Sequence, residues 1–138
     1  MEYVGFDRET FKFFKNIEDS RPLHMLNLVQ LKKESIYPDS TITTGLEAYT
    51  RYGEESEPVF KRVGGSIVWR GDMLIGLIGP ADEKWNICFI AEYPSVESFI
   101  AMQRDETYRK AVEHRQIAVK NSRLIRMAPS NRGTNFAF

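Results

Sequence analysis

Hydrophobic residues follow two different patterns along this chain. Residues 23–31 (LHMLNLVQL) and 86–92 (NICFIAE) are apolar at nearly every position, which is typical of strands that are covered on both faces. Other stretches carry apolar residues at helical spacing, over residues 7–17, 44–63, 95–102 and 107–119. The pattern therefore predicts strands and helices that follow one another along the chain.

Capping residues mark where these helices begin. Four side chains are placed to accept a backbone hydrogen bond from a first helical turn: Asp7, Thr44, Ser95 and Asp105. Phe6 can pack on Phe11 across the first turn of the first helix, and Thr44 with Glu47 matches a capping box. The pair Gly64-Gly65 is expected to end the second helix.

Three stretches lack a helical pattern. Residues 32–44 (KKESIYPDSTITT) mix charged residues with Ser, Thr and Pro, so we expect a long loop there. Loops of this length often carry function. Residues 66–79 predict one long strand, which Gly71-Asp72 redirects as a bulge. A short strand over residues 123–127 precedes the tail. The chain thus supplies four strands for one sheet.

The order of these elements predicts an α+β fold. After an N-terminal helix the chain runs strand, helix, strand, strand, helix, strand, which is the ferredoxin-like β-α-β-β-α-β arrangement with both helices on one face of a four-stranded antiparallel sheet. We divide the chain into an N-terminal helical extension (1–21), the ferredoxin-like domain (22–129) and a C-terminal tail (130–138). Because the strands are apolar on both sides, we expect two copies to pair sheet to sheet as a homodimer.

Composition narrows the class of partner. The 138 residues fit one domain, and 19 basic residues balance 19 acidic ones without a cluster of either sign, so we expect no nucleic-acid or membrane partner. The single cysteine, Cys88, lies in an apolar strand and allows neither a disulfide framework nor a Cys-based zinc site. The N-terminus lacks signal-peptide features and no apolar run approaches about twenty residues, so we expect a soluble, cytoplasmic protein.

Several positions together resemble a known family. They are Asn27-Leu28, Tyr49, Tyr52, Gly64-Gly65, Tyr93-Pro94-Ser95, Phe99, Asp105, Tyr108 and Arg115. Over about Pro22 to Pro129 this pattern resembles the domain-of-unknown-function family 1330, in the dimeric α/β-barrel superfamily. The resemblance implies a ferredoxin-like protomer that forms a homodimeric α/β barrel, without implying an activity. The chain departs from shorter members in its N-terminal helix, its loop over residues 32–44 and its aromatic tail.

Arg115 is the most informative candidate for ligand binding. The last helix carries one inward stripe, made of Tyr108, Ala111, Val112, Arg115 and Val119. This spacing directs a guanidinium toward the body of the protein, where a charge is costly without a partner. Its fork suits planar anions, so Arg115 is predicted to hold a substrate carboxylate or enolate oxygen. The alternative is an internal ion pair with Glu92 or with an acid of the first helix.

Polar groups elsewhere in the expected interior add further candidates. Asn27 interrupts an apolar strand, and its amide either bonds a neighbouring segment or holds a substrate oxygen or a developing oxyanion. Tyr49, Tyr52 and Tyr108 supply phenols. These phenols are either core residues with satisfied hydroxyls or the lining of a cleft for an aromatic substrate, in which one of them donates a proton.

Histidine and tryptophan complete the predicted site. His114 is either exposed or a general base, and His24 is most simply a packed strand residue. In the superfamily's cofactor-free monooxygenases Asn, Trp and Arg side chains are implicated, and Trp85 is one of two tryptophans that offer that residue type. The predicted catalytic residues are His114, Tyr108 and Asn27, and the predicted substrate-binding residues are Arg115, Tyr49, Tyr52 and Trp85. We predict no cofactor and no metal, because the histidines lack metal-ligand spacing.

Three functions remain open at this point. The first is a homodimer with a small-molecule pocket between helices and sheet, including a cofactor-independent monooxygenase- or isomerase-like enzyme that acts on a small aromatic or enolisable carbonyl compound. The second is a non-catalytic ligand-binding or stress-protective dimer, in which Arg115 and Asn27 are structural. The third is a haem-binding protein that uses His114 or His24.

Overall fold

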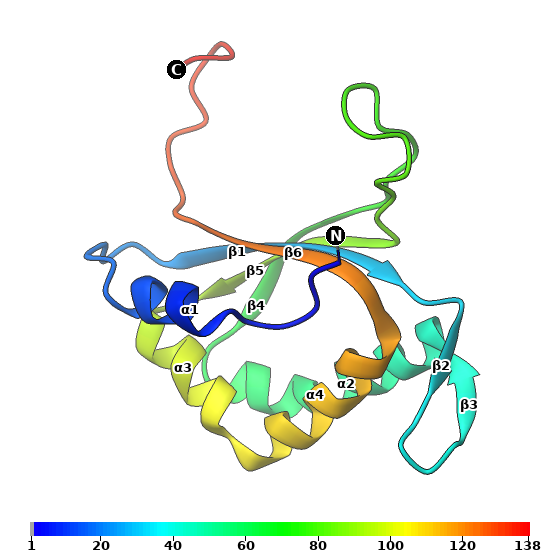
Figure 1. Cartoon of the computed structure of the whole chain (residues 1–138). Coiled ribbons are helices and arrows are strands. Elements are labelled where there is room, and N and C mark those ends of the chain that lie inside the picture. Colours follow the sequence, from blue (N-terminus) through cyan, green and yellow to red (C-terminus); the bar gives the residue numbers. More distant parts are fainter. Residues whose placement is uncertain (1) are drawn as a thin grey trace.

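A four-stranded antiparallel sheet organises the computed structural model, which describes residues 2–138 (Figure 1). Its strands, in the spatial order β4-β5-β1-β6, are β1 (Leu23–Leu31), β4 (Ser66–Gly71), β5 (Ile87–Tyr93) and β6 (Val119–Met127). β1 pairs with β5 on one side and with β6 on the other. This order and these connections are the ferredoxin-like arrangement, so the predicted fold class is confirmed.

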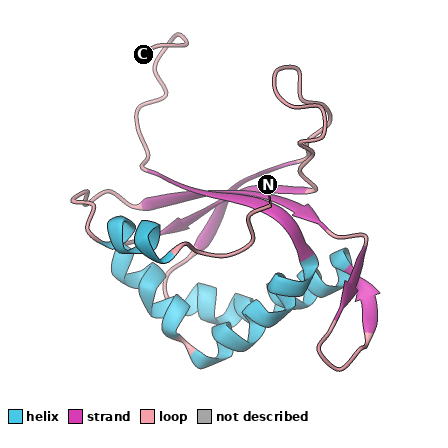
Figure 2. Cartoon of the chain, viewed as in Figure 1, coloured by secondary structure: helices cyan, strands magenta, loops and turns pink. Residues whose placement is uncertain are grey.

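All the helices of residues 2–138 lie on one side of this sheet (Figure 2). They are α1 (Arg8–Lys15), α2 (Gly45–Arg62), α3 (Val96–Arg104) and α4 (Glu106–Ala118). α2 and α4 pack along each other, and α3 leads into α4 through a single residue, Asp105. Within the described part of the chain, every helix is too short or too polar to cross a lipid bilayer.

The predicted capping residues are confirmed. Each side chain accepts a hydrogen bond from a backbone N–H three residues on: Asp7 from Thr10 (2.9 Å), Thr44 from Glu47 (3.0 Å), Ser95 from Ser98 (3.1 Å) and Asp105 from Tyr108 (3.0 Å). The rings of Phe6 and Phe11 stack with centroids 5.1 Å apart, as expected for a hydrophobic staple. Gly64 has φ +90° just after α2, a conformation that favours glycine, and so ends the helix as predicted.

The prediction of a long loop over residues 32–44 was wrong. β2 (Glu34–Ile36) pairs with β3 (Ile42–Thr44) as a small antiparallel hairpin beside the helices (Figure 1). Its turn is stabilised by Asp39, whose carboxylate accepts from the Thr41 N–H at 2.9 Å, and Ser40 takes φ +72°. Local turn chemistry therefore outweighs the polar composition of this stretch.

Two strand boundaries also differ from the prediction. β4 ends at Gly71, and residues 72–86 form a loop, because β5 begins at Ile87 and offers no partner beyond the Gly71–Cys88 pair. The bulge lies earlier, between Ile67 and Trp69. β6 begins at Val119, four residues before the predicted start at Arg123, since α4 runs straight into it.

The core between sheet and helices is divided into two clusters. The larger contains Leu23 and Met25 of β1 with residues of all three longer helices, and Phe11 and Phe14 of α1 pack against it. The smaller contains Val29 of β1 with residues of α2, α4 and β6. Asn27, which projects to the same face of β1 between these residues, belongs to neither cluster. The apolar packing is therefore interrupted at the middle of the sheet.

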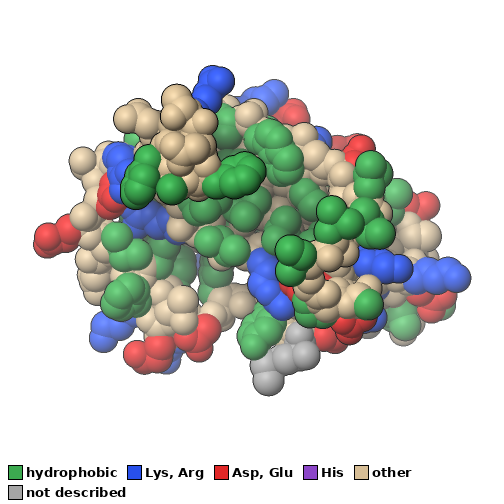
Figure 3. Space-filling model, turned by 90° about the horizontal axis from the view of Figure 1, so that it is seen from above, with side chains coloured by type: hydrophobic (Ala, Val, Ile, Leu, Met, Phe, Trp, Pro, Cys, Tyr) green, Lys and Arg blue, Asp and Glu red, His purple; other side chains and the backbone are tan. Residues whose placement is uncertain are grey.

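The other face of the sheet carries apolar side chains without a covering helix. Figure 3 looks onto this face and shows hydrophobic side chains gathered over it. Trp69 and Ile125 are 50% and 44% exposed there. The loop 72–86 and the tail from residue 128 project from the same side (Figure 1). Both carry exposed apolar side chains, including Ile78 at 99% and Phe138 at 89% exposure.

Candidate functional site

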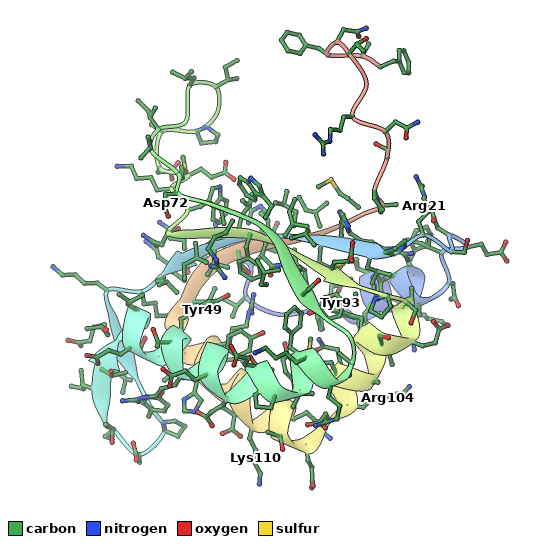
Figure 4. The ribbon with its side chains drawn as sticks, turned by 180° about the vertical axis from the view of Figure 1, so that it is seen from behind. Arg21, Tyr49, Asp72, Tyr93, Arg104 and Lys110 are labelled. Carbon is green, nitrogen blue, oxygen red and sulfur yellow. The ribbon has the colours of Figure 1, made fainter. Side chains whose placement is uncertain are left out.

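A cavity of about 1460 Å³ lies between the inner face of the sheet and the helices. It is larger than the roughly 300–1,000 Å³ of an ordinary small-molecule site. Tyr49 on α2 and Tyr93 on β5 both lie in the space between sheet and helices, whereas Lys110 points away from it (Figure 4). A cavity thus lies between helices and sheet, and its use as a small-molecule pocket stays a prediction.

Strand register arranges the floor of the cavity in rows, because antiparallel partners project to the same face. The central row runs across all four strands and contains Arg70, Phe89, Asn27 and Leu124. On either side of it lie rows that contain Val29 with Ser122 and Met25 with Arg126. Polar and cationic groups thus alternate with apolar side chains on the floor.

Tyrosines of α2 and α4 form the roof. The hydroxyl oxygens of Tyr52 and Tyr108 lie 2.7 Å apart, and the rings of Tyr49 and Tyr52 are 5.3 Å apart. Burial raises the pKa of Tyr49 to about 12, while the charges of Arg115 and Arg70 oppose this shift. Burial, followed by the neighbouring Tyr108, raises the pKa of Tyr52 well above its ordinary value. The phenols of Tyr49 and Tyr52 therefore remain protonated at neutral pH and can act as hydrogen-bond donors.

Arg115 lines the cavity, and its hydrogen bonds go to neutral groups. Nη1 donates to the Val4 carbonyl oxygen at 2.5 Å, and Nη2 donates to Ser122 Oγ at 3.4 Å. Glu92, the ion-pair partner considered from sequence, lies instead on the other face of the sheet, where it contacts His24 at 2.6 Å. Within residues 2–138 no carboxylate lies within 4.0 Å of the Arg115 guanidinium.

Arg70 is a cavity residue that the sequence analysis did not select. Its guanidinium lies over the Phe89 ring, 5.2 Å from the centroid, and its charge reaches Tyr49 together with that of Arg115. Arg70 is visible in the strand sequence SIVWRG, but the bulge between Ile67 and Trp69 changes which residues of this strand face the cavity. Alternation alone therefore could not assign Arg70 to the inner face.

Asn27 faces the cavity as predicted, at the centre of the floor. Its Nδ2 donates to the Met25 carbonyl oxygen at 3.0 Å, which fixes the orientation of the amide. Its Oδ1 receives no hydrogen bond from the residues that the structure describes. This oxygen remains available to a bound molecule that carries a hydroxyl or amide donor.

His114 and Trp85 lie outside the cavity. His114 Nδ1 is 2.6 Å from the Tyr37 hydroxyl, and its Nε2 is 2.6 Å from Glu55 Oε2, so it joins the hairpin to α2. Trp85 faces Arg123, whose guanidinium lies 5.4 Å from the Trp85 ring. The structure thus brings together Asn27, Tyr108, Arg115, Tyr49 and Tyr52 and leaves these two residues apart.

The N-terminal segment before α1 lines the β6 side of the cavity. Tyr3 N donates to Asn121 Oδ1 at 2.8 Å, and Ser122 Oγ donates to the Tyr3 carbonyl oxygen at 2.8 Å. With the bond from Arg115 to Val4, these contacts tie residues 3–4 to β6 and α4. The extension is therefore part of the site.

Comparison with solved structures finds two close matches and more distant ones. A protein of unknown function from Rhodopseudomonas palustris is 50% identical, with a TM-score of 0.91 over 95% of this chain and 99% of that chain. The methylated form of that protein gives a TM-score of 0.94 at 50% identity, over 96% and 98% of the two chains. An uncharacterised NIPSNAP-like domain protein from Burkholderia xenovorans, 11% identical with a TM-score of 0.54 over 85% and 92%, shares the fold alone.

Sequence comparison places the chain in a family. This placement comes from a family model, whereas a search of individual curated proteins finds no match. The family model described as Domain of unknown function (DUF1330) matches residues 40–127, which is more than half of the chain. The match begins after β1, so Asn27 and the N-terminal segment precede it. The resemblance found in the sequence is confirmed, and the chain belongs to the DUF1330 family.

Proposed function

We propose that this protein binds a small organic anion with an apolar body in the cavity between its sheet and helices. The observation that carries the proposal is the placement of Arg115, a cavity-lining guanidinium whose described hydrogen bonds go only to a carbonyl and a hydroxyl oxygen. A charge in a partly desolvated site is costly unless an opposite charge compensates it. A ligand carboxylate or enolate oxygen would supply that charge.

The rest of the lining supports the same class of ligand. Tyr49 and Tyr52 offer protonated hydroxyls, Tyr108 adds a third phenol, and Arg70 adds a second positive charge. Phe89 and Leu124 provide apolar surface for the body of the ligand. Acidic side chains in the lining are exposed: Asp7, which caps α1, Glu54, and Glu57, which pairs with Lys61 at 3.4 Å.

A catalytic version of this site has a specific observation in its favour. The 2.7 Å contact between Tyr52 and Tyr108 allows one phenol to donate a proton while the other stabilises the resulting charge. Bound beside Arg115, an enolate would take that proton at carbon to give the carbonyl compound, and the phenolate left behind would recover a proton from water. This is the isomerase-like form of the proposal, and it requires the same anion site.

The test is calorimetric titration with aromatic carboxylates and with their uncharged amides. We expect phenylacetate and benzoate to bind more tightly than phenylacetamide and benzamide. Arg115→Gln should lower carboxylate affinity by about tenfold or more while leaving the amides unchanged, since a charge-assisted hydrogen bond is lost. Lys110→Gln is the matched control, because Lys110 lies on the same helix and points away from the cavity.

The proposal fails if the carboxylates and amides bind alike, or if Arg115→Gln unfolds the protein and Arg115→Lys does not retain carboxylate binding. Circular dichroism of each variant separates loss of folding from loss of the ligand site.

We also propose that two copies pair through the bare sheet face. Support comes from the exposed apolar residues of that face and from the loop 72–86 and the tail, which extend beyond it on the same side. Leu74, Leu77 and Ile78 are almost fully exposed. Apolar surface on this scale is unusual for a monomer, and an isologous interface of more than about 1,000 Å² would cover it.

Trp69 offers a direct test of this pairing. In a Trp85→Phe variant, Trp69 fluorescence should shift to longer wavelength on dilution as the sheet faces separate, in step with a halving of mass in analytical ultracentrifugation. Ile125→Glu should give a folded monomer. A wild-type protein that is monomeric at micromolar concentration would refute the pairing.

A further inference from the structure

Arg126 lies in the cavity lining on the row next to Asn27, and its guanidinium is incompletely paired. Nη2 donates to the Asp19 carbonyl oxygen at 3.4 Å, and the group lies over the Phe14 ring, 5.4 Å from the centroid. Nη1 is buried and has no hydrogen-bond partner among the residues that the structure describes. Buried polar atoms are usually paired, and because solvent does not reach Nη1, the Arg126 side chain has to turn toward the cavity before a bound molecule can accept from this nitrogen.

Asp19, whose carboxylate senses the charge of Arg126, is already paired with another arginine. Asp19 accepts from the Arg21 side chain at 2.7 Å, and this bond lowers the pKa of Asp19 well below its ordinary value, with a smaller contribution from the charge of Arg126. No side-chain carboxylate within residues 2–138 forms an ion pair with Arg126. The positive charge of Arg126 is therefore not compensated by an ion pair within residues 2–138.

Two of the arginines that line the cavity mark opposite ends of β6: Arg115 of α4 contacts one end, and Arg126 lies toward the other. Ser122, Leu124 and Arg126 of β6 project to the inner face, and Arg115 contacts Ser122. Ser122 and Arg126 are four positions apart on β6, so their Cα atoms lie about 13 Å apart. The row that contains Asn27 and Leu124 lies between them. The volume of about 1460 Å³ leaves room for a molecule that reaches both ends.

From this spacing we infer that the ligand is an elongated dicarboxylate, with one carboxylate held by Arg115 and the other by Arg126. The inference rests on the proposed anion site and extends it to a substrate class. The planar fork of each arginine matches a carboxylate. Leu124 and Phe89 contact the apolar chain between the two charges, and Asn27 Oδ1 accepts from any hydroxyl on that chain.

The experiment is a titration of α,ω-dicarboxylates from succinate to sebacate, each compared with the monocarboxylate of the same carbon number. We expect affinity to peak at an intermediate length, where the diacid binds about tenfold or more tightly than its monoacid. Arg126→Gln should weaken diacid binding much more than monoacid binding and so remove most of that difference, whereas Arg115→Gln should weaken both. Arg21→Gln is the control for damage to the segment that packs on Arg126.

Each outcome separates this inference from the proposed function. Equal binding of diacids and monoacids, or an equal loss of both in Arg126→Gln, overturns the dicarboxylate and leaves the anion site standing. Absence of binding by any acid overturns the anion site and the dicarboxylate together. If Arg126→Gln does not fold, Arg126→Lys is measured instead, and retention of the diacid preference supports the second anchor.

Discussion

The hydroxyl groups of Tyr52 and Tyr108 are hydrogen-bonded at 2.7 Å, which joins α2 to α4 across the roof of the cavity. Tyr108 belongs to the larger core cluster and Tyr52 packs against both clusters, so this hydrogen bond lies where the core borders the cavity. The pair therefore contributes both to the shape of the cavity and to the spacing of the helices.

Removing one hydroxyl of this pair should cost at least as much unfolding free energy as removing both. Tyr52→Phe and Tyr108→Phe each leave one buried phenol unpaired, and each should lower the free energy of unfolding by about 1 kcal/mol. The double variant should lose no more than the larger single loss. Urea denaturation of the four proteins measures this cycle, and additive losses would show that the two hydroxyls act independently.

Alkaline pH should destabilise the protein through Tyr49. Its pKa is about 12 in the folded state and about 10 when unfolded, so the folded state retains its proton over this interval. The stabilisation is complete below pH 10 and is lost as the pH rises toward 12. At about pH 11 the wild type should lose about 1 kcal/mol more than Tyr49→Phe, relative to about pH 8.

Urea denaturation at the two pH values measures that difference, and the ultraviolet absorbance of phenolate reports the titration itself. If Tyr49 titrates at its ordinary pKa, the wild type and Tyr49→Phe will lose stability equally, and the cavity must then admit water freely to that hydroxyl.

Two glycines of α2 should respond oppositely to alanine. A Cβ at Gly45 would clash with the carbonyl oxygen of Lys32, whose own N–H is bound to Ala118 O at 2.8 Å. Gly45→Ala should therefore cost about 1–3 kcal/mol of unfolding free energy. A Cβ at Gly53 meets nothing within 4 Å, so Gly53→Ala should stabilise the helix by up to about 1 kcal/mol. Thermal or urea unfolding measures both changes, and similar effects of the two would contradict the packing at the start of α2.

His114 should prove structural and not catalytic. His114→Ala removes the contacts to Tyr37 and Glu55, and amide hydrogen exchange in the hairpin β2–β3 should become about tenfold faster, as expected for loss of one hydrogen bond. Carboxylate affinity in the cavity should not change. A loss of affinity without faster exchange in the hairpin would return His114 to the binding site.

The fold was predictable because its signals are local. The caps at Asp7, Thr44, Ser95 and Asp105 and the apolar run of β1 determine where most elements start, and the order of elements then selects the topology. The end of β4 was not predictable in this way, since residues 72–79 are apolar enough for a strand and lack only a neighbour to pair with. Pairing is a property of the whole sheet.

The candidate site was predictable where a helix carries it. The stripe with Tyr108 and Arg115 follows from helical spacing, and both residues line the cavity. Arg126 was missed because its inward direction depends on its pairing with Met25, and nothing local distinguishes it from Arg123. Trp85 was placed in the site by residue type alone, and it is not among the residues that line the cavity, although its neighbour Arg123 is.

Tyr3 and Val4 line the β6 side of the cavity as a wall, and they precede the residues that the family model matches. It is bound to Arg115 and Ser122 through its backbone carbonyl oxygens, so many side chains could replace those of Tyr3 and Val4 while the wall stays in place. The size of the cavity could accordingly change in evolution through the residues before α1, while the sheet and the arginines of the lining stay the same.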